Sequence, residues 1–379
     1  MKVVVAIDSL KGSMSSMEAG RAIEEGIRRA VSDVEVIVKP LADGGEGTTE
    51  AFVEGMGGEM RFLDVMGPLG EKQTASYGYL AETKTAIIEM ASSSGIILVP
   101  REKLNPKKAT TYGVGELIKD AIAKGCREFI IGIGGSATND CGIGMLSALG
   151  FTFYDSAGNP VGISGDVLKD VAKINLDNAI PELQECHFKI ACDVTSPLCG
   201  PTGATYIFGP QKGVTPDMLV DFDKAHANFA KCTREATGKD CMDAPGAGAA
   251  GGLGFAFLSY LNSELERGID LVINAVGLEE CLIGADIVVT GEGCLDHQTA
   301  MGKVPVGIAK LARKHGAVVI AFAGCITPDA PECNEAGIHA YFPILPGVLT
   351  LEEAMQPENA RKNMANTAEQ AFRLIQAMK

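Results

Sequence analysis

Residues 35–50 read EVIVKPLADGGEGTTE, and this stretch indicates the fold class. The run EVIVKPL is rich in β-branched residues, as expected for a buried strand, whereas TTE opens the next helical pattern. Between them, Asp43 and Glu46 stand among three glycines. A strand that passes through a glycine-rich loop into a helix is the repeating unit of parallel α/β sheets. The two carboxylates on so bare a backbone raise the question of a ligand.

The same succession of an apolar strand and a glycine-rich loop recurs along the chain. It is seen in VVVAID (3–8), EFIIGIGG (128–135), ADIVVTGEG (285–293) and AVVIAFAG (317–324). Continuous apolar strands of this kind fit a parallel sheet that is covered on both faces. A helical pattern follows the first strand, and Ser15 and Glu18 have the spacing of a capping box at its start. The pattern therefore predicts an α/β fold with a doubly wound parallel sheet.

Two regions follow a different pattern. Residues 60–91 hold three strand-like runs that are separated by short polar turns, which predicts an antiparallel meander. Residues 151–264 mix isolated strands with Gly- and Pro-rich loops. We therefore predict a discontinuous chain of two domains. Residues 1–58, 110–150 and 265–379 build the parallel sheet, and residues 59–109 and 151–264 form a second α/β domain with antiparallel strands.

The length and composition of the chain exclude several classes of function. A chain of 379 residues suggests two or three domains, and a net charge of −15 argues against nucleic acid as a partner. The sequence starts directly on a strand, without a secretory cleavage pattern, and it has no apolar run of about 18 residues. Its eleven cysteines form no C-x-x-C pair. We therefore expect a cytoplasmic protein with reduced thiols and no membrane association.

The loops that follow four strands carry the chemistry. They are Asp8 to Ser13, Asp43 to Gly47, Gly132 to Asp140, and Thr290 to Asp296. Ligands of open parallel sheets bind beyond the carboxyl ends of the strands. If the four strands belong to one sheet, these loops meet at one edge of it. That convergence predicts an active site.

The loop GIGGSATND (132–140) has three interpretations. Its glycines and the hydroxyls of Ser136 and Thr138 suit a phosphate, and a tightly packed turn explains the same residues equally well. Gly132-x-Gly134-x-x-Ala137 also fits a dinucleotide fingerprint, with Asp155 as the ribose-binding acid. An NAD(P)-dependent oxidoreductase therefore stays open, as does a non-catalytic protein that binds a small acid.

Carboxylates and lysines at the strand ends suit a metal-assisted reaction of phosphates. Mg²⁺ is held by one or two carboxylates together with waters and substrate phosphates. The candidate carboxylates are Asp43, Glu46, Asp193, Glu292 and Asp296, and the candidate lysines are Lys11, Lys212 and Lys303. For each carboxylate taken alone, a helix cap or a solvated loop is the better interpretation, and it is their common place at the ends of apolar strands that favours a metal. The small-residue run DAPGAGAAGGLGFAF (243–257) can admit a ligand or another backbone.

Taken together, six motifs resemble the bacterial glycerate kinases. They are DSLKGSMSS, PLADGGEGT, GIGGSATNDCGIGML, CDVTSPLCGPTGATYIFGPQKG, GAGAAGGLG and TGEGCLDHQTAMGKVP, and they follow one another in the family's order from Asp8 to Pro305. The resemblance implies phosphorylation of D-glycerate by ATP with Mg²⁺, at the 2-hydroxyl. It also implies a flavodoxin-like domain into which a different α/β domain is inserted.

The resemblance, with the arguments above, assigns roles to particular residues. We predict Asp193, Asp296 and Lys11 as catalytic, and Gly134, Gly135, Ser136, Thr138 and Asn139 as nucleotide-binding. We predict Ser9, Ser13, Lys212 and Lys303 as substrate-binding, and Asp43, Glu46 and Glu292 as metal ligands. Two positions depart from the family pattern: Cys294 stands where arginine is common, and His297 stands where a small residue is common. A homo-oligomer is compatible with the sequence.

Overall fold

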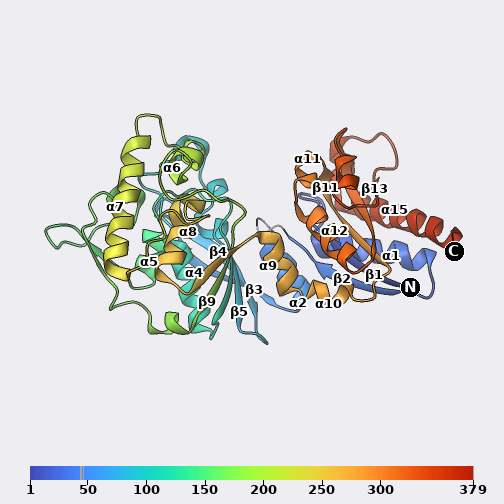
Figure 1. Ribbon diagram of the computed structural model, residues 1–379, viewed down its shortest axis with the longest axis horizontal. Coiled ribbons are helices and arrows are strands. Elements are labelled where there is room, and N and C mark those ends of the chain that lie inside the picture. The colour runs from blue at the N-terminus through green and yellow to red at the C-terminus, as the bar shows by residue number, and fades with distance from the viewer. Residues whose placement is uncertain (43–44, 46, 379) are drawn as a thin grey trace. The chain divides into compact units, whose positions relative to one another are not determined.

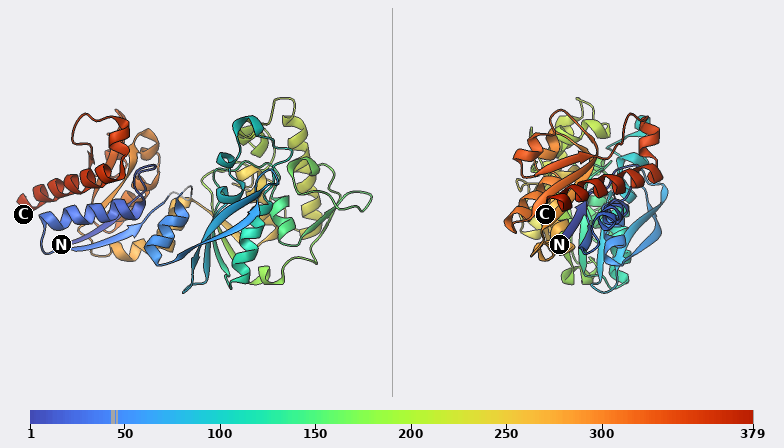
Figure 2. Two further views of the ribbon diagram at one scale, coloured as in Figure 1. Left: turned by 180° about the vertical axis from the view of Figure 1, so that it is seen from behind. Right: turned by 90° about the vertical axis from the view of Figure 1, so that its right-hand side faces the viewer.

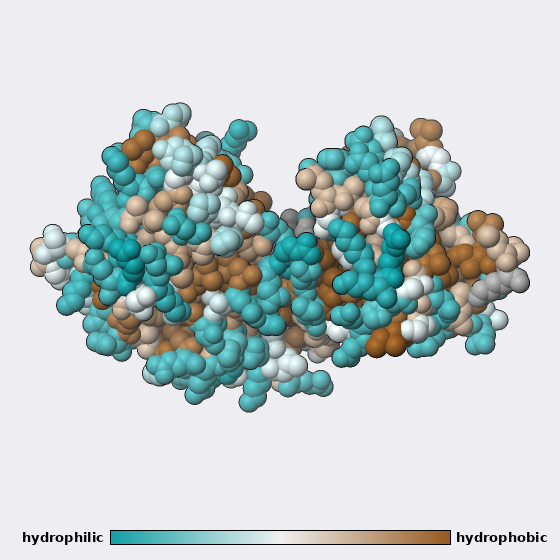
Figure 3. Space-filling view, viewed as in Figure 1, coloured by the Kyte–Doolittle hydropathy of each residue, from teal (hydrophilic) through white to brown (hydrophobic). Residues whose placement is uncertain are grey.

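The computed structural model describes residues 1–42, 45 and 47–378, and the chain divides into two compact units. Unit 1 comprises Met1–Asp43, Glu50–Gly57 and Ile269–Lys379. Unit 2 comprises Gly44–Thr49 and Gly58–Gly268. Both ends of the chain therefore lie in unit 1 (Figure 1). The surface of each unit in the view of Figure 3 is largely hydrophilic, as expected from the high net charge.

Unit 1 is built on a parallel sheet of five strands in the order β13-β12-β11-β1-β2. The strands are β1 (Lys2–Ile7), β2 (Glu35–Pro40), β11 (Ile287–Leu295), β12 (Val318–Ile326) and β13 (Ala340–Pro343). Counted along this unit alone, the order is 2-1-3-4-5, which is that of flavodoxin. The predicted flavodoxin-like sheet is thus confirmed for this unit.

Helices cover both faces of this sheet, as its continuous apolar strands require. Helices α1 (Ser16–Ala30) and α15 (Pro357–Ala377) lie side by side (Figure 2) and share one core with Val3, Val5 and Ile7 of β1. The intervening residue Val4 is also fully buried, and α12 (Val304–Lys314) packs on β11 and β12. The capping box predicted at Ser15 and Glu18 starts α1.

Unit 2 contains a mixed sheet of six strands in the order β10-β9-β6-β5-β4-β3. The strands are β3 (Glu59–Met66), β4 (Lys72–Leu80), β5 (Thr85–Glu89), β6 (Glu128–Gly132), β9 (His187–Ala191) and β10 (Ser263–Glu266). The pairs β3–β4 and β4–β5 are antiparallel, which confirms the predicted meander. The other neighbours pair in parallel.

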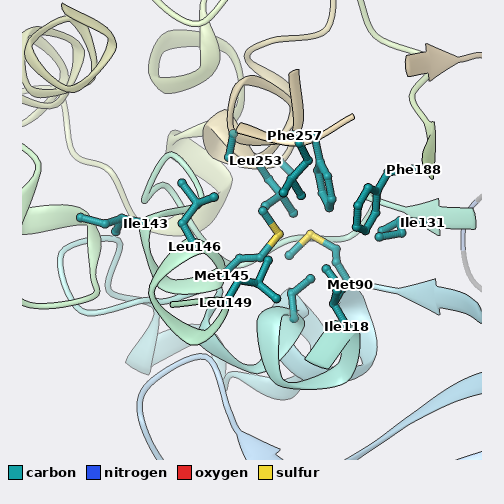
Figure 4. Packing of buried hydrophobic residues seen from close by; sticks show 14 of the residues in the cluster. Met90, Ile118, Ile131, Ile143, Met145, Leu146, Leu149, Phe188, Leu253 and Phe257 are labelled. Atoms are coloured by element: carbon teal, nitrogen blue, oxygen red, sulfur yellow. The ribbon is translucent and has the colours of Figure 1, made fainter. Parts of the chain in front are cut away.

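The core of unit 2 joins this sheet to its helices. Figure 4 shows Met90 and Met145 between Ile118 of α4 (Tyr112–Ala123) and Phe257 of α8 (Ala249–Tyr260). The other main helices of this unit are α5 (Ile143–Ala148) and α7 (Leu219–Thr237). The four side chains named here are fully buried, so the unit has a core of its own.

The remaining elements are short. In unit 1 and at its junctions they are α2 (Thr48–Met56), α9 (Gly268–Ala275), α10 (Leu278–Leu282), α11 (His297–Ala300), α13 (Glu332–Glu335) and α14 (Leu351–Met355). In unit 2 they are α3 (Ala91–Ser94), α6 (Ala204–Phe208), the pair β7 (Thr152–Tyr154) and β8 (Lys173–Asn175), and 3₁₀ turns at Ile96–Leu98, Arg101–Lys103, Gly165–Val167, Pro181–Glu185 and Pro210–Lys212.

The placement of residues 110–150 with the first sheet was wrong. Strand β6 pairs with β5 and β9 of unit 2, and Phe129 stacks on its register partner Phe188 with ring centroids 4.7 Å apart. The apolar run of β6 indicates a strand that is buried on both faces, and parallel strands of either sheet can have such a run. The pattern therefore gives the strand but not the sheet to which it belongs. In consequence, the four loops follow strands of two different sheets, and they do not meet at the edge of a single sheet.

The small-residue run 243–257 receives another backbone rather than a ligand. Gly251 has a φ of +68°, and a Cβ there would lie 2.1 Å from the carbonyl oxygen of Thr138. The Cys141 N–H donates to the Gly251 carbonyl at 2.9 Å. Only glycine combines this conformation with so close an approach. The run at the start of α8 thus packs directly on the loop that follows β6.

We expect Gly251→Ala to lower the free energy of unfolding of unit 2 by about 2 kcal/mol or more, because it adds a steric clash to the cost of a left-handed backbone. Gly158→Ala is the matched control. Gly158 also has a positive φ of +84°, but no described atom lies within 4 Å of its Cβ position. This control should cost only about 1 kcal/mol. Chemical denaturation of both variants measures the difference, and equal losses would contradict the close packing.

Candidate active site

The sheet of unit 1 has one topological switch point, between β1 and β11. From β1 the chain continues to β2 on one side, whereas β12 and β13 follow β11 on the other side. Ligands of open α/β sheets bind beyond the strand ends at such a point. A pocket of about 430 Å³ lies there. Its polar lining is Asp8, Ser9, Lys11, Ser13, Glu292, Cys294, Asp296, Lys303 and Cys325.

The loop after β1 forms one wall of this pocket. The Asp8 N–H donates to the Gly291 carbonyl at 3.0 Å, which holds the loop against β11. Leu10 and Met14 then close a tight turn through Gly12, whose φ is +77°. The Ser13 hydroxyl oxygen is buried and has no hydrogen-bond partner within the part of the chain that the structure describes. An unpaired buried hydroxyl in a pocket wall suits a polar ligand.

The end of β11 forms a second wall. The Thr299 hydroxyl lies 2.6 Å from a carboxylate oxygen of Glu292 and 3.2 Å from one of Asp296, so both carboxylates meet at one point. Asp296 also caps α11 by accepting the Thr299 N–H at 3.0 Å. Burial alone would raise the pKa of Asp296, but this N–H and the Lys303 charge hold it below its ordinary value. Asp296 is therefore ionised at neutral pH.

Two thiols complete this part of the wall. Cys294 and Cys325 face each other as register partners on β11 and β12. Burial and the neighbouring Cys325 thiol raise the pKa of Cys294 to about 12. Cys294, at the position where the resemblance leads us to expect arginine, therefore brings no charge. The cations in the pocket lining are Lys11 and Lys303, and both side chains are exposed.

The predicted nucleotide loop lies in unit 2. Gly134 and Gly135 are exposed, whereas Ser136, Thr138 and Asn139 are buried. Lys212, predicted to bind substrate, is also buried beneath this loop. Its ammonium group donates to the Ser136 hydroxyl at 2.7 Å and to the Thr138 carbonyl at 2.6 Å. Only the backbone at the two glycines thus offers an open surface, and the remaining side chains hold the loop in shape.

Burial lowers the pKa of Lys212 to about 7, with Asp140 acting in the opposite direction. Because an unfolded lysine keeps its proton up to the ordinary pKa of 10.5, the unfolded state binds more protons between these two values, and stability rises with pH. We expect the stability of the wild type relative to Lys212→Met to rise by up to about 1.4 kcal/mol per pH unit above pH 7.

The exposed Lys224 on α7 provides the control for this measurement. The stability difference between the wild type and Lys224→Met should not change over the same range of pH. Chemical denaturation at several pH values measures both differences. If the stability difference between the wild type and Lys212→Met stays constant with pH, burial does not lower the pKa of Lys212.

Other predicted residues lie elsewhere. Asp43 and Glu46 fall outside the described residues. Asp193 is exposed after β9 in unit 2 and accepts the Gly268 N–H at 3.0 Å. Asp155, the ribose-binding acid of the oxidoreductase alternative, lies in a turn after β7, where it accepts the backbone N–H of Asn159 at 2.9 Å. Because β7 pairs with β8 and not with the sheet that contains β6, Asp155 does not stand at a neighbouring strand end.

The sequence prediction missed part of the pocket. The motifs assign no role to Asp8, although its place directly after β1 is a signal that points to it. Ile344, Leu351 and Met355 also line the pocket, and they follow β13 in a region without any motif. Their contribution depends on the sheet order, which places β13 at the edge beside β12, so that the residues after it belong to the same end of the sheet as those after β11 and β1.

A parallel sheet with carboxylates and lysines gathered at its switch point is the arrangement of an α/β enzyme that binds a polar ligand. A model described as "Glycerate kinase family" matches residues 3–376. The chain belongs to the glycerate kinase family, and it is a kinase. The recognition made from the six motifs is therefore confirmed, and the finding speaks against the oxidoreductase and the non-catalytic binding protein.

Similar proteins cover the whole chain. A glycerate kinase from Haemophilus influenzae is 44% identical over 99% of both chains. A glycerate 2-kinase from Escherichia coli is 46% identical over 94% of this chain and 93% of its own. The crystal structure of a candidate glycerate kinase 2 from Salmonella typhimurium LT2 matches with a TM-score of 0.92 at 43% identity, and covers 100% of this chain and 98% of that one. No helix among the described residues is long and apolar enough to cross a membrane.

Proposed function

We propose that this protein transfers the γ-phosphoryl group of ATP to the 2-hydroxyl of D-glycerate with the help of Mg²⁺. The family membership supports the kinase reaction, and the name of the Escherichia coli relative supports the 2-hydroxyl as acceptor. The observation that carries the proposal for the site is the meeting of Glu292 and Asp296 at the Thr299 hydroxyl, in one pocket with Lys11 and Lys303.

The pocket residues fit a magnesium ion that arrives with its nucleotide. Within the described residues there is no cluster of three or more side chains that could hold a metal alone. Mg²⁺ does not require such a cluster, because substrate phosphates and waters supply most of its ligands. Glu292 and Asp8 are the carboxylates that we assign to the ion. When bound, Mg²⁺ would offset negative charge on the phosphates.

Lysines supply the remaining positive charge. In phosphoryl transfer most of the catalysis comes from positioning and charge stabilisation. We assign Lys11 to the transferred phosphoryl group and Lys303 to the anionic groups beside it, since both line the pocket. Ser9 and Ser13 line the same pocket, and their hydroxyls are suited to donate hydrogen bonds to the same oxygens. Ile344, Leu351 and Met355 offer an apolar wall for the uncharged part of the nucleotide.

A carboxylate must orient the acceptor hydroxyl and receive its proton. We assign this role to Asp296, which is held in the ionised form by its hydrogen bonds and by Lys303. Asp193 stays a predicted catalytic residue of unit 2. The exposed backbone of Gly134 and Gly135 stays a predicted phosphate contact, with Ser136, Thr138, Asn139 and Lys212 as its support.

The assay is the release of ADP from ATP and Mg²⁺ in the presence of D-glycerate. We expect turnover that depends on both D-glycerate and the metal, with L-glycerate and glycolate as controls for the acceptor. Removal of Mg²⁺ with a chelator should abolish the reaction, and added Mg²⁺ should restore it. A folded protein that gives no ADP with any small hydroxy acid would contradict the proposal.

A further inference from the structure

We propose that Cys294 and Cys325 form a reversible disulfide in the wall of the pocket of unit 1 and that this bond slows the kinase reaction. The regulatory half of this proposal rests on the proposed function, whereas the formation of the disulfide does not. The two residues are direct register partners on the neighbouring parallel strands β11 and β12. Both are free thiols, and both line the pocket.

The geometry of the strands allows the bond. Neighbouring strands lie about 4.8 Å apart, and disulfides join residues whose Cα atoms are about 4.4–6.8 Å apart. Side chains of register partners point to the same face of a sheet. The backbones also approach closely here, since a Cβ on Gly324 would lie 2.7 Å from the Gly293 carbonyl oxygen. No helix or loop therefore has to unfold before the two sulfur atoms can meet.

The accessibility of the two thiols gives the order of the steps. Cys325 is exposed, whereas Cys294 is only partly exposed. The Cys325 sulfur attacks a small-molecule disulfide such as oxidised glutathione, and one thiol of that reagent leaves. The Cys294 sulfur then attacks Cys325 and releases the second thiol. The two cysteines together lose two electrons and two protons, and the reagent is reduced to two thiols.

The bond acts on the residues that we assign to phosphoryl transfer. Cys294 lies on β11 between Glu292, on the same strand, and Asp296, which caps α11. A disulfide draws the two sulfur atoms to about 2.05 Å, well inside their van der Waals separation. The bond fixes the end of β11 in one position and fills the space between the two carboxylates with a rigid group, and a displacement of about 1 Å at reacting groups costs on the order of 100-fold in rate. We therefore expect the oxidised protein to lose at least about tenfold in activity and to regain it after reduction.

The first test is chemical and needs no activity. The full chain is incubated with oxidised glutathione, unreacted thiols are blocked, and its mass and peptides are determined. We expect two fewer blocking groups than on the reduced protein, and a peptide in which Cys294 is linked to Cys325 and which is about 2 Da lighter than the sum of its two thiol peptides. Cys294→Ser and Cys325→Ser should each lack this link, and Cys281→Ser, which changes a partly exposed thiol outside the pocket lining, should keep it. Absence of the link in the folded wild type would overturn the proposal.

The second test compares ADP release before oxidation, after oxidation and after reduction by dithiothreitol. Each protein is compared with its own reduced form. Reversible loss in the wild type and in Cys281→Ser, with no such loss in the two other variants, would support the switch. A linked protein that keeps its full activity would overturn the regulatory role. If the reduced wild type shows no activity at all, the proposed function fails, while the mass and peptide data still decide whether the disulfide forms.

Discussion

Asp296→Asn is expected to lower kcat by about 100-fold or more, because it removes the carboxylate that we assign to receive the proton of the acceptor hydroxyl. The fold should be retained, since asparagine is as good a helix cap as aspartate, and α11 keeps its first hydrogen bond. We therefore expect the melting temperature to change by no more than about 3 °C. Steady-state ADP release and thermal unfolding of the same preparation measure the two effects.

Asp155→Asn is the matched control for this substitution. Asp155 also accepts a backbone N–H, but in an exposed turn of unit 2 outside the pocket. Its replacement should leave kcat unchanged. If Asp296→Asn keeps near-normal turnover, the carboxylate serves only as a cap, and the acceptor base has to be sought elsewhere, with Asp193 as the first candidate.

Lys11→Met is expected to lower kcat by about 100-fold to 1000-fold, because a positive charge that stabilises the transferred phosphoryl group is lost. Methionine keeps much of the length of the side chain, so the pocket should keep its shape. The KM for ATP should change much less than kcat if the lysine acts on the transition state rather than on the bound nucleotide. Steady-state kinetics with varied ATP separates the two parameters.

The control for Lys11 is Lys310→Met. Lys310 is an exposed lysine on α12, outside the pocket lining. Its replacement removes one positive charge from the same unit, as Lys11→Met does. It should keep wild-type kcat and KM. A rise in KM alone for Lys11→Met would move this residue from transition-state stabilisation to nucleotide binding. Equal effects of both variants would point to the net charge of unit 1 instead of a particular contact.

The sequence predicted strands well but not their neighbours. The continuous apolar runs correctly indicated β1, β2, β6, β11 and β12. Four of these strands are buried on both faces, whereas the edge strand β2 is only partly buried. The pairing of β6 with β5 and β9 depends on contacts such as Phe129 with Phe188, which lie far apart in the chain. A local pattern contains no record of such a partner, and this is why residues 110–150 were placed in the wrong domain.

For the site residues too, a local motif does not show which side chains the fold buries. Lys11, Glu292, Asp296 and Lys303 were found from glycine-rich motifs at strand ends, and the structure brings them into one pocket. Lys212 has the same local appearance, but it is fully buried. Its burial arises from the packing of the 3₁₀ turn Pro210–Lys212 against the loop after β6, so that the ammonium group reaches the Thr138 carbonyl. No motif separates a lysine that meets a ligand from one that supports a loop.

The identity of the phosphorylated product tests the central claim most directly. The protein is incubated with ATP, Mg²⁺ and D-glycerate, and the product is examined by phosphorus NMR with proton coupling. We predict 2-phosphoglycerate, whose phosphorus couples to the single proton on C2 and gives a doublet. A triplet from coupling to the two protons on C3 would show 3-phosphoglycerate and contradict the proposed acceptor. The absence of any phosphoglycerate from a folded protein would contradict the account as a whole.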